Sequence, residues 1–274
     1  MPPGRVRRTT AAILLWALAA LPLAAAAETG SEVPPSPLVT AAVLKARLAE
    51  VQEATDLTDE ARERRIGLYR RSLSNLEMVQ AHRAAGAAYR GTAEAAPGQI
   101  EALRSARAEI AAEDSFAALD LDPGSPLPVL QRHLQEERAD LAAVQARHDD
   151  LATRLTYQEA RPSAVRQRLT EADAAREAAF AGLQAEATKR ANKHRVSALS
   201  QARRWELETR YQALSTEIQM LDQELLSRPA RLQLLQAQKD KEAASIEWIS
   251  ARVVALEERI LAARQQAVEL ARTQ

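Results

Sequence analysis

The side chains with catalytic or metal-binding potential are scattered along this 274-residue chain. Its four histidines are His82, His133, His148 and His194, and no two of them have the spacing of metal ligands on one helix face. The chain has no His-Glu-x-x-His, no Gly-x-Ser-x-Gly and no glycine-rich phosphate loop. Cysteine is absent, which excludes thiolate catalysis, disulfides and cysteine-based zinc sites. We therefore expect no catalytic residue, no cofactor, no metal and no small-molecule substrate, and we predict that the protein is not an enzyme.

The remaining candidate groups fit a structural role better than a chemical one. Asp120 and Asp122 resemble the start of a calcium loop, but no EF-hand pattern follows them. They lie in segment 114–126, whose prolines and glycine indicate a solvated hinge loop. His148 falls on an apolar seam, where it is either a pH-sensitive group or, as we prefer, a partly exposed seam residue. Acidic pairs at 149–150 and 257–258 are interpreted as solvated helix faces.

The composition indicates long helices. Hydrophobic residues make up 46% of the chain and aromatic residues only 3%, with 27% charged and eight glycines. A compact core usually contains more large aromatic side chains, whereas long helices and coiled coils do not need them. The 37 basic and 37 acidic residues balance, which argues against a nucleic-acid-binding protein, since such proteins normally carry a basic excess. The predicted fold class is all-α, with long antiparallel helical hairpins or coiled coil.

The first residues have the three parts of a secretory signal peptide. Arg5, Arg7 and Arg8 form a basic start, an apolar run follows over 11–26, and an Ala-x-Ala end precedes a polar stretch. The run is short for a bilayer core of about 30 Å, which disfavours the alternative of an uncleaved anchor. We predict cleavage after Ala27 and a periplasmic location in a Gram-negative cell, with association to the inner membrane left open.

Three prolines divide the mature chain at nearly equal spacing: Pro97, Pro162 and Pro229. Proline lacks an N–H and disrupts a helix interior, but it suits the first turn of a helix. We therefore predict a structural corner at each proline, with the flanking helices paired antiparallel; the alternative is a kinked, continuous helix. The predicted organisation is signal peptide 1–27, flexible leader 28–37, first helical unit 38–113, hinge loop 114–126, second helical hairpin 127–190 and third helical hairpin 191–274.

The helices are predicted from start signals and apolar periodicity. Ser36-Pro37 is expected to start a short helix with Val43, Leu44, Leu48 and Val51 facing inward, and Thr58 to cap the next one. From residue 127 a seam with alternating steps of three and four follows: Leu130, Leu134, Glu137, Leu141, Val144, His148, Leu151, Leu155. After Pro229 six heptads have Leu232, Lys239, Ile246, Val253, Ile260, Ala267 at a, and Leu235, Glu242, Ile249, Leu256, Ala263, Leu270 at d.

These helical segments resemble a known family. The stretches Leu130–Gln145, Leu151–Leu155, Ala160–Leu169, Arg210–Leu226 and Asp240–Ala263 are similar to the N-terminal periplasmic "porin" domain of large MscS-superfamily mechanosensitive channels (MscK/KefA type). The likeness covers nearly all of the mature chain. It implies an exported helical domain that precedes a membrane-embedded heptameric pore, which releases solutes under membrane tension. No transmembrane or pore-lining helix is recognised before Gln274, so no pore residue is carried over, and we expect either the front part of a longer channel or a free-standing relative.

The function expected on these grounds is a scaffold, assembly or envelope-contact role related to osmotic-shock solute efflux. The expected partners are further copies of the chain or a membrane channel subunit. The basic segment Thr188–Arg195 is interpreted as a solvated joint, with contact to anionic lipid or peptidoglycan as its functional alternative. The rival hypothesis is a periplasmic coiled-coil adaptor or chaperone-like protein unrelated to channels.

Overall fold

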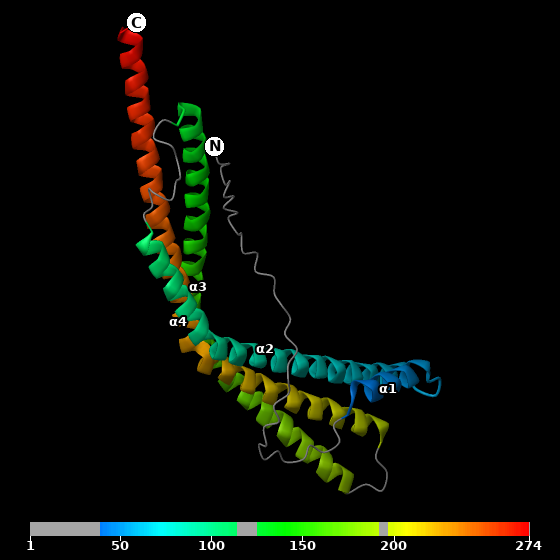
Figure 1. The fold of residues 1–274 in the computed structure, drawn as a ribbon. Coiled ribbons are helices and arrows are strands. Elements are labelled where there is room, and N and C mark those ends of the chain that lie inside the picture. The colour runs from blue at the N-terminus through cyan, green and yellow to red at the C-terminus, as the bar shows by residue number, and fades with distance from the viewer. Residues whose placement is uncertain (1–38, 114–124, 192–196, 274) are drawn as a thin grey trace, which may run out of the picture. The chain divides into compact units, whose positions relative to one another are not determined.

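The computed structural model describes residues 39–113, 125–191 and 197–273. These residues form four α-helices and no strand: α1 (Ala41–Glu53), α2 (Asp59–Ala112), α3 (Leu127–Ala191) and α4 (Ala198–Thr273) (Figure 1). The all-α prediction is confirmed. All four helices belong to one compact unit, residues 38–274. The predicted signal peptide with Ala27, the leader 28–37 and most of the hinge loop lie outside the described residues.

Threonine caps the two N-terminal helices. The Thr58 Oγ1 accepts a hydrogen bond from the Ala61 N–H at 3.3 Å, and Asp59 and Glu60 occupy the first turn, as predicted. The first helix begins later than expected. Its N-cap is Thr40, whose Oγ1 accepts from the Val43 N–H, whereas the predicted start at Ser36-Pro37 lies outside the described residues. Val43 is 43% exposed and does not face inward, because the buried face of α1 is formed by Leu44 and Val51.

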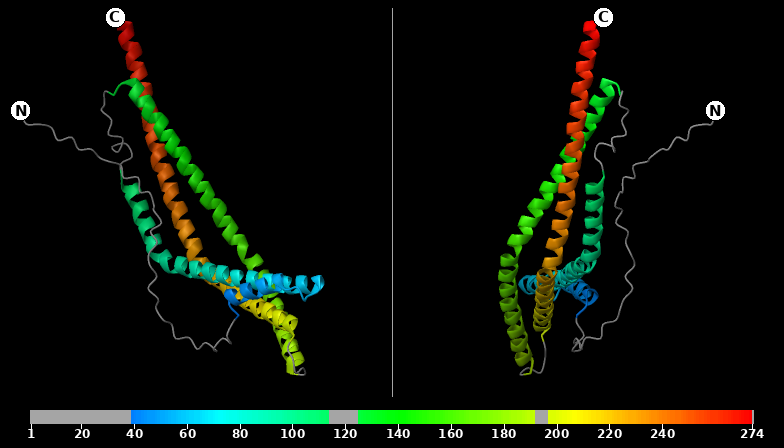
Figure 2. Two further views of the ribbon diagram at one scale, coloured as in Figure 1. Left: turned by 90° about the vertical axis from the view of Figure 1, so that its right-hand side faces the viewer. Right: turned by 60° about the vertical axis from the view of Figure 1, so that its left-hand side comes forward.

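The long helix α4 packs against both of the other long helices. It runs antiparallel to α3, because Leu130 near the start of α3 packs on Leu256 and Ile260, whereas Leu155 packs on Leu235. It runs parallel to α2, because positions on both helices advance together: Asn75 bonds to Thr209, Gly86 faces Met220 and Ala96 packs on Leu234. Figures 1 and 2 show the same arrangement, with α4 beside both partners. One α3–α4 hairpin therefore replaces the two predicted within residues 127–274.

The prolines are not corners. Pro97 lies inside α2, Pro162 inside α3 and Pro229 inside α4, so the predicted antiparallel turn at each proline is wrong and the alternative of a continuous helix holds. The ribbons continue unbroken, and α2 and α4 change direction between their two halves (Figures 1 and 2). A proline inside a helix kinks it by removing one backbone hydrogen bond and by crowding the preceding turn. Packing between the long helices on both sides of each proline offsets this local cost.

The heptad pattern of α3 is confirmed. Leu130, Glu137, Val144, Leu151 and Leu155 are buried against α4. In α4 the predicted d positions are buried from Leu235 to Leu256, but Leu270 is 64% exposed, since it lies beyond the part of α4 that packs on α3. Several buried residues of α2 are small, as at Ser72, Gly86 and Ala96. Small side chains let α2 and α4 approach closely.

Candidate functional site at the level of the prolines

The helices meet in a polar cluster at the level of the three prolines, here called the proline layer. Ala96 of α2 packs with Ala230 and Leu234 of α4, which brings the neighbours of Pro97 and Pro229 together. Arg161, the neighbour of Pro162, contacts Glu224 of α4. The layer consists of Tyr89 from α2, Gln158 and Arg161 from α3, and Glu224, Ser227, Arg228 and Arg231 from α4. Its side chains connect all three long helices.

One side chain replaces the backbone bond that Pro162 removes. In a regular helix the N–H of residue 162 would donate to the carbonyl oxygen of Gln158, and proline has no N–H. The Nε of Arg228 donates to this oxygen at 3.3 Å. Arg228 directly precedes Pro229 in sequence, so the residue before one proline satisfies the carbonyl freed by another. This bond explains how α3 remains continuous through Pro162.

The turn before Pro229 is also stabilised by side chains. The carbonyl oxygen of Glu224 accepts hydrogen bonds from Arg231 Nη2 at 2.7 Å and from Ser227 Oγ at 3.2 Å. Arg231 Nε also donates to the Ser227 hydroxyl at 3.2 Å. Ser227 is only 3% exposed. These bonds connect Arg231 to the turn of α4 that precedes Pro229.

A buried ion pair joins α3 to α4 in the layer. Arg161 donates to both carboxylate oxygens of Glu224, from Nε at 2.8 Å and from Nη2 at 3.3 Å. The Glu224 side chain is 5% exposed and the Arg161 side chain 36% exposed. The hydrogen bond to Glu224 raises the pKa of the Arg161 guanidinium above its ordinary value. The pair is bidentate, so it fixes the relative orientation of the two helices as well as their distance.

Arg231 extends the network to α2. Its Nη1 donates to Gln158 Oε1 at 2.8 Å, and its guanidinium lies 4.8 Å from the centre of the Tyr89 ring. Such a cation–π contact adds roughly 0.5–2 kcal/mol, depending on how well water is excluded. Burial, and then the charge of Glu224, raise the pKa of Tyr89, so the phenol stays neutral at physiological pH. Arg231 therefore contacts all three long helices.

The buried polar atoms of the proline layer bond to one another and hold the helices together. Among the described residues, the buried side-chain polar atoms without a hydrogen-bond partner are in Arg62, Arg65, Gln212, Trp248 and Arg252, all outside the layer. No fully buried side-chain polar atom of the layer therefore lacks a hydrogen-bond partner. A search of the same described residues found no group of three or more His, Cys, Asp or Glu that could hold a metal ion.

Further ion pairs connect α3 and α4 on both sides of the layer. Five link the two helices directly among the described residues: Glu137–Arg252 at 2.5 Å, Arg138–Glu257 at 2.6 Å, Arg147–Glu242 at 3.2 Å, Arg168–Glu217 at 2.6 Å and Glu186–Arg203 at 3.7 Å. Arg252 also lies 4.3 Å from the centre of the Trp248 ring. Burial raises the pKa of Glu137 despite the attraction of Arg252. The pairs fix the register of the hairpin, because a shift by one turn would break all of them together.

Sequence analysis singled out the three prolines as structural residues but not the polar side chains around them. The structure brings Pro97, Pro162 and Pro229 to one level, while Ala27 lies outside the described residues. His148, predicted to be a partly exposed seam residue, has a 27% exposed side chain 3.3 Å from Asp149 Oδ1. Arg161, Glu224 and Arg231 were missed. The Arg-Pro dipeptides at 161–162 and 228–229 were the available signal, since both arginines reach across to the opposite helix.

Comparison with known proteins places the chain in a family. The family model described as "Mechanosensitive ion channel porin domain" matches residues 47–274, which is most of the chain. No curated protein and no solved structure matches it. In the part of the chain that the structure describes, no helix is both long enough and apolar enough to cross a membrane. Because the match spans almost the whole helical region, the chain belongs to the mechanosensitive ion channel porin domain family.

Proposed function

We propose that this chain is a periplasmic helical scaffold of a mechanosensitive channel system. It acts by assembly with itself or with a channel subunit, or by contact with the cell envelope, and it carries out no catalytic reaction. The family match over residues 47–274 is the observation that carries this proposal. The apolar run and the Ala-x-Ala end before Glu28 support export to the periplasm.

The helical architecture suits a scaffold. At 1.5 Å per residue, the 76 residues of α4 have a contour length of about 114 Å. Helix α3 accompanies α4 with ion pairs from Glu137 near its start to Glu186 near its end. A long helix that forms ion pairs with its neighbour at several points resists sliding and transmits displacement from one end to the other. The prolines set where the helices bend, and the proline layer fixes that bend.

Export can be tested on the expressed full chain. The mature protein is expected in the periplasmic fraction with Glu28 as its first residue, as read by mass spectrometry of the intact protein. The substitution Ala25→Arg changes the small residue two positions before the expected cleavage site and should leave the precursor unprocessed. A matched Ala20→Ser substitution lies within the apolar run and should not affect cleavage. Recovery of unprocessed wild-type protein in the cytoplasm would contradict the proposed location.

The osmotic role can be tested by survival after hypo-osmotic shock. Deletion of the gene in a strain that lacks other such channels is expected to lower survival, and re-expression of the wild-type chain to restore it. Unchanged survival would contradict a role in solute efflux and would favour the rival function of a periplasmic adaptor or chaperone-like protein. The double substitution Arg161→Met and Glu224→Met removes the ion pair of the proline layer. If this variant accumulates to the wild-type level, its survival after hypo-osmotic shock measures whether the ion pair is needed for function.

A further inference from the structure

Each long helix carries a proline at the same level of the molecule. In the described part of the chain, α2, α3 and α4 are the helices that cross the proline layer, and they contain Pro97, Pro162 and Pro229 there. A proline removes one backbone hydrogen bond of its helix, and sharp helix kinks occur mainly at prolines and glycines. Helices α2 and α4 change direction at this level (Figures 1 and 2). All three helices therefore lack a backbone bond at the point where the chain bends.

Two glycines weaken α2 further on either side of Pro97. Gly91 and Gly98 lie inside α2, and a Cβ at either position would meet no neighbouring side chain or helix within 4 Å. Gly86 differs, because a Cβ there would lie 3.6 Å from the Met220 Cα. Close packing thus does not require glycine at positions 91 and 98, whereas glycine in a helix interior lowers the stability of the helix. The segment of α2 around Pro97 consequently bends more easily than the rest of this helix.

The helices are packed firmly on both sides of the layer, here called the first arm and the second arm. The first arm consists of α1 and residues 59–88, 165–191 and 198–221, and the second arm of residues 100–112, 127–155 and 234–273. In the first arm an apolar cluster that includes Leu44 of α1, Ile66 of α2 and Ala202 of α4 holds these helices together. Arg168 of α3 pairs there with Glu217 of α4 at 2.6 Å. The first arm therefore has its own core and its own ion pair.

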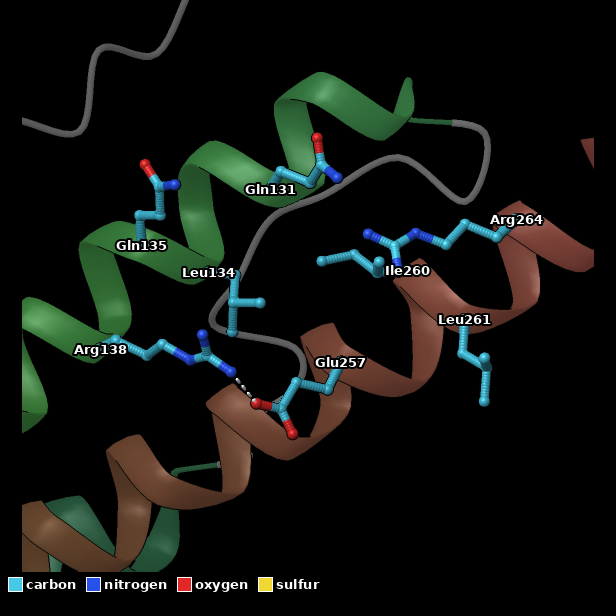
Figure 3. A pocket seen from close by; sticks show the side chains of 8 residues that line it. All are labelled: Gln131, Leu134, Gln135, Arg138, Glu257, Ile260, Leu261 and Arg264. Atoms are coloured by element: carbon cyan, nitrogen blue, oxygen red, sulfur yellow. Dashed lines mark hydrogen bonds and ion pairs between the residues drawn. The ribbon is translucent and has the colours of Figure 1, made fainter.

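The second arm is held together in the same way. Leu130 of α3 packs on Leu256 and Ile260 of α4. Arg138 of α3 reaches Glu257 of α4 at 2.6 Å, across a groove between the two helices (Figure 3). Each arm is thus cross-linked independently of the layer between them.

The layer itself is joined mainly by long polar side chains. Arg161, Arg228 and Arg231 reach across it to acceptors on neighbouring helices. Its apolar packing uses small side chains, such as Ala96 against Ala230. Close-packed large side chains resist a change of angle because they fit in one arrangement, whereas an arginine can follow its acceptor by changing rotamers. The contacts in the layer therefore tolerate bending better than the cores of the two arms.

We propose that the proline layer is a hinge, at which the first and second arms change their mutual angle while each arm stays rigid. Helices α3 and α4 bend together, because the ion pair between Arg161 and Glu224 keeps them side by side at the hinge. The arginine network sets the resting angle. This inference goes beyond the scaffold role proposed above, since it concerns motion within one chain and holds for any partner of the chain.

Distances between two spin labels, measured by double electron–electron resonance on the mature protein, test the hinge. The chain has no cysteine, so two cysteine substitutions place the labels without ambiguity. Met78→Cys with Val254→Cys spans the layer, and both residues are exposed. Along their helices these positions lie about 27 Å and about 38 Å from the layer, at 1.5 Å per residue, so a change of about 10° in the angle moves the labels by roughly 3 Å.

Label pairs within one arm are the matched controls. Met78→Cys with Phe180→Cys lies in the first arm, and Val254→Cys with Thr153→Cys lies in the second arm; all of these residues are exposed. Each control shares one label with the pair that spans the layer, so the motion of the label itself is accounted for. The distribution of distances across the layer is expected to be at least about twice as wide as in either control, since bending by about 10° in each direction spreads the distances by roughly 6 Å. Equal widths in all three pairs would overturn the proposal.

Two further variants act on the hinge in opposite directions. Gly91→Ala with Gly98→Ala strengthens α2 around Pro97 and should narrow the distribution across the layer, whereas Gly67→Ala in the first arm should leave it unchanged. Arg231→Met removes contacts with all three long helices and should widen the distribution. Each variant is compared at wild-type far-UV circular dichroism, and the glycine variant decides alone if Arg231→Met does not fold.

The location of the hinge is refuted if none of these variants that fold changes the width across the layer. A change of width in the pairs within one arm would show that the arms themselves bend, and this result would also overturn the proposal. Survival of osmotic shock plays no part in these measurements, so the hinge and the proposed function can fail independently of each other.

Discussion

Removal of Arg161 is the sharpest test of the proline layer. The substitution Arg161→Met keeps the aliphatic length of the side chain but leaves the Glu224 carboxylate, which is 5% exposed, without its bidentate partner. Loss of one member of a buried pair typically costs 3–5 kcal/mol, since the remaining charge is uncompensated. Arg161 is itself 36% exposed, so water can reach part of the vacated space. We therefore expect the free energy of unfolding to fall by about 2 kcal/mol.

The reverse substitution is expected to cost less. Glu224→Met leaves Arg161 free to turn into water, and Arg231 still donates to the Glu224 backbone carbonyl, so a loss of about 1 kcal/mol is expected. The double variant removes both charges, and a pair replaced by apolar groups is often close to neutral. Its loss should be smaller than the sum of the two single losses, with a coupling of about 1–2 kcal/mol.

Urea denaturation of the mature protein, followed by far-UV circular dichroism, measures these differences. Thermal unfolding provides a check, since 2 kcal/mol corresponds to a shift of roughly 4–8 °C in Tm for a chain of this size. The matched control is Arg166→Met, an exposed arginine about one turn further along α3. The reasoning is refuted if Arg161→Met and the control lie within about 0.5 kcal/mol of each other, or if the single losses simply add.

Three further predictions concern helix continuity, helix contact and pH. Arg228→Ala should cost about 1 kcal/mol in the wild-type chain and almost nothing in a Pro162→Ala background, where an N–H is restored to the Gln158 carbonyl; equal costs in urea denaturation would contradict the replacement of that bond. Gly86→Ala should stabilise the protein by about 0.5–1 kcal/mol, because alanine favours the helix and its Cβ would lie at an ordinary contact distance of 3.6 Å from the Met220 Cα. Gly86→Leu should destabilise the protein by about 1–3 kcal/mol, because the larger side chain does not fit between α2 and α4. Both changes are measured as shifts in the urea midpoint, and destabilisation by alanine would contradict the reasoning. The hydrogen bond from Lys189 lowers the pKa of Glu186, so its carboxylate stabilises the fold above the ordinary carboxyl pKa, and that contribution is lost as the pH falls through the lowered folded pKa. Urea midpoints measured across that acidic range should fall less steeply for Glu186→Gln than for wild type, and parallel profiles would contradict this role.

Local properties of the sequence were sufficient to predict the helical class, the start of α2 and the seam of α3. The start of α2 at Thr58 follows from its hydroxyl and the two acids behind it, which act within one turn. The buried seam of α3 follows from steps of three and four residues, because each residue sees mainly one partner helix. Both signals involve neighbours in the chain, and a single sequence contains them completely.

The path of the chain at each proline was not a local property. An interior proline costs a helix about 3 kcal/mol, which made a corner the natural prediction. The carbonyl freed by Pro162 is bonded instead by Arg228, 70 residues away in sequence. Ion pairs along the whole α3–α4 contact stabilise the continuous helices further. No pattern around Pro162 alone contains this compensation.

The sequence by itself determined the helical class, the start of α2 and the periodic face of α3, because hydrogen bonding within one turn and helical periodicity are encoded by residues close in sequence. Only the tertiary structure decided that α4 is shared between α2 and α3. Because α4 is buried on two faces, it does not have one apolar stripe that would identify one partner helix. Its two partners therefore cannot be assigned from its own sequence pattern. The same packing decided that the three prolines lie inside continuous helices, at one level joined by hydrogen bonds and ion pairs, and do not form three corners.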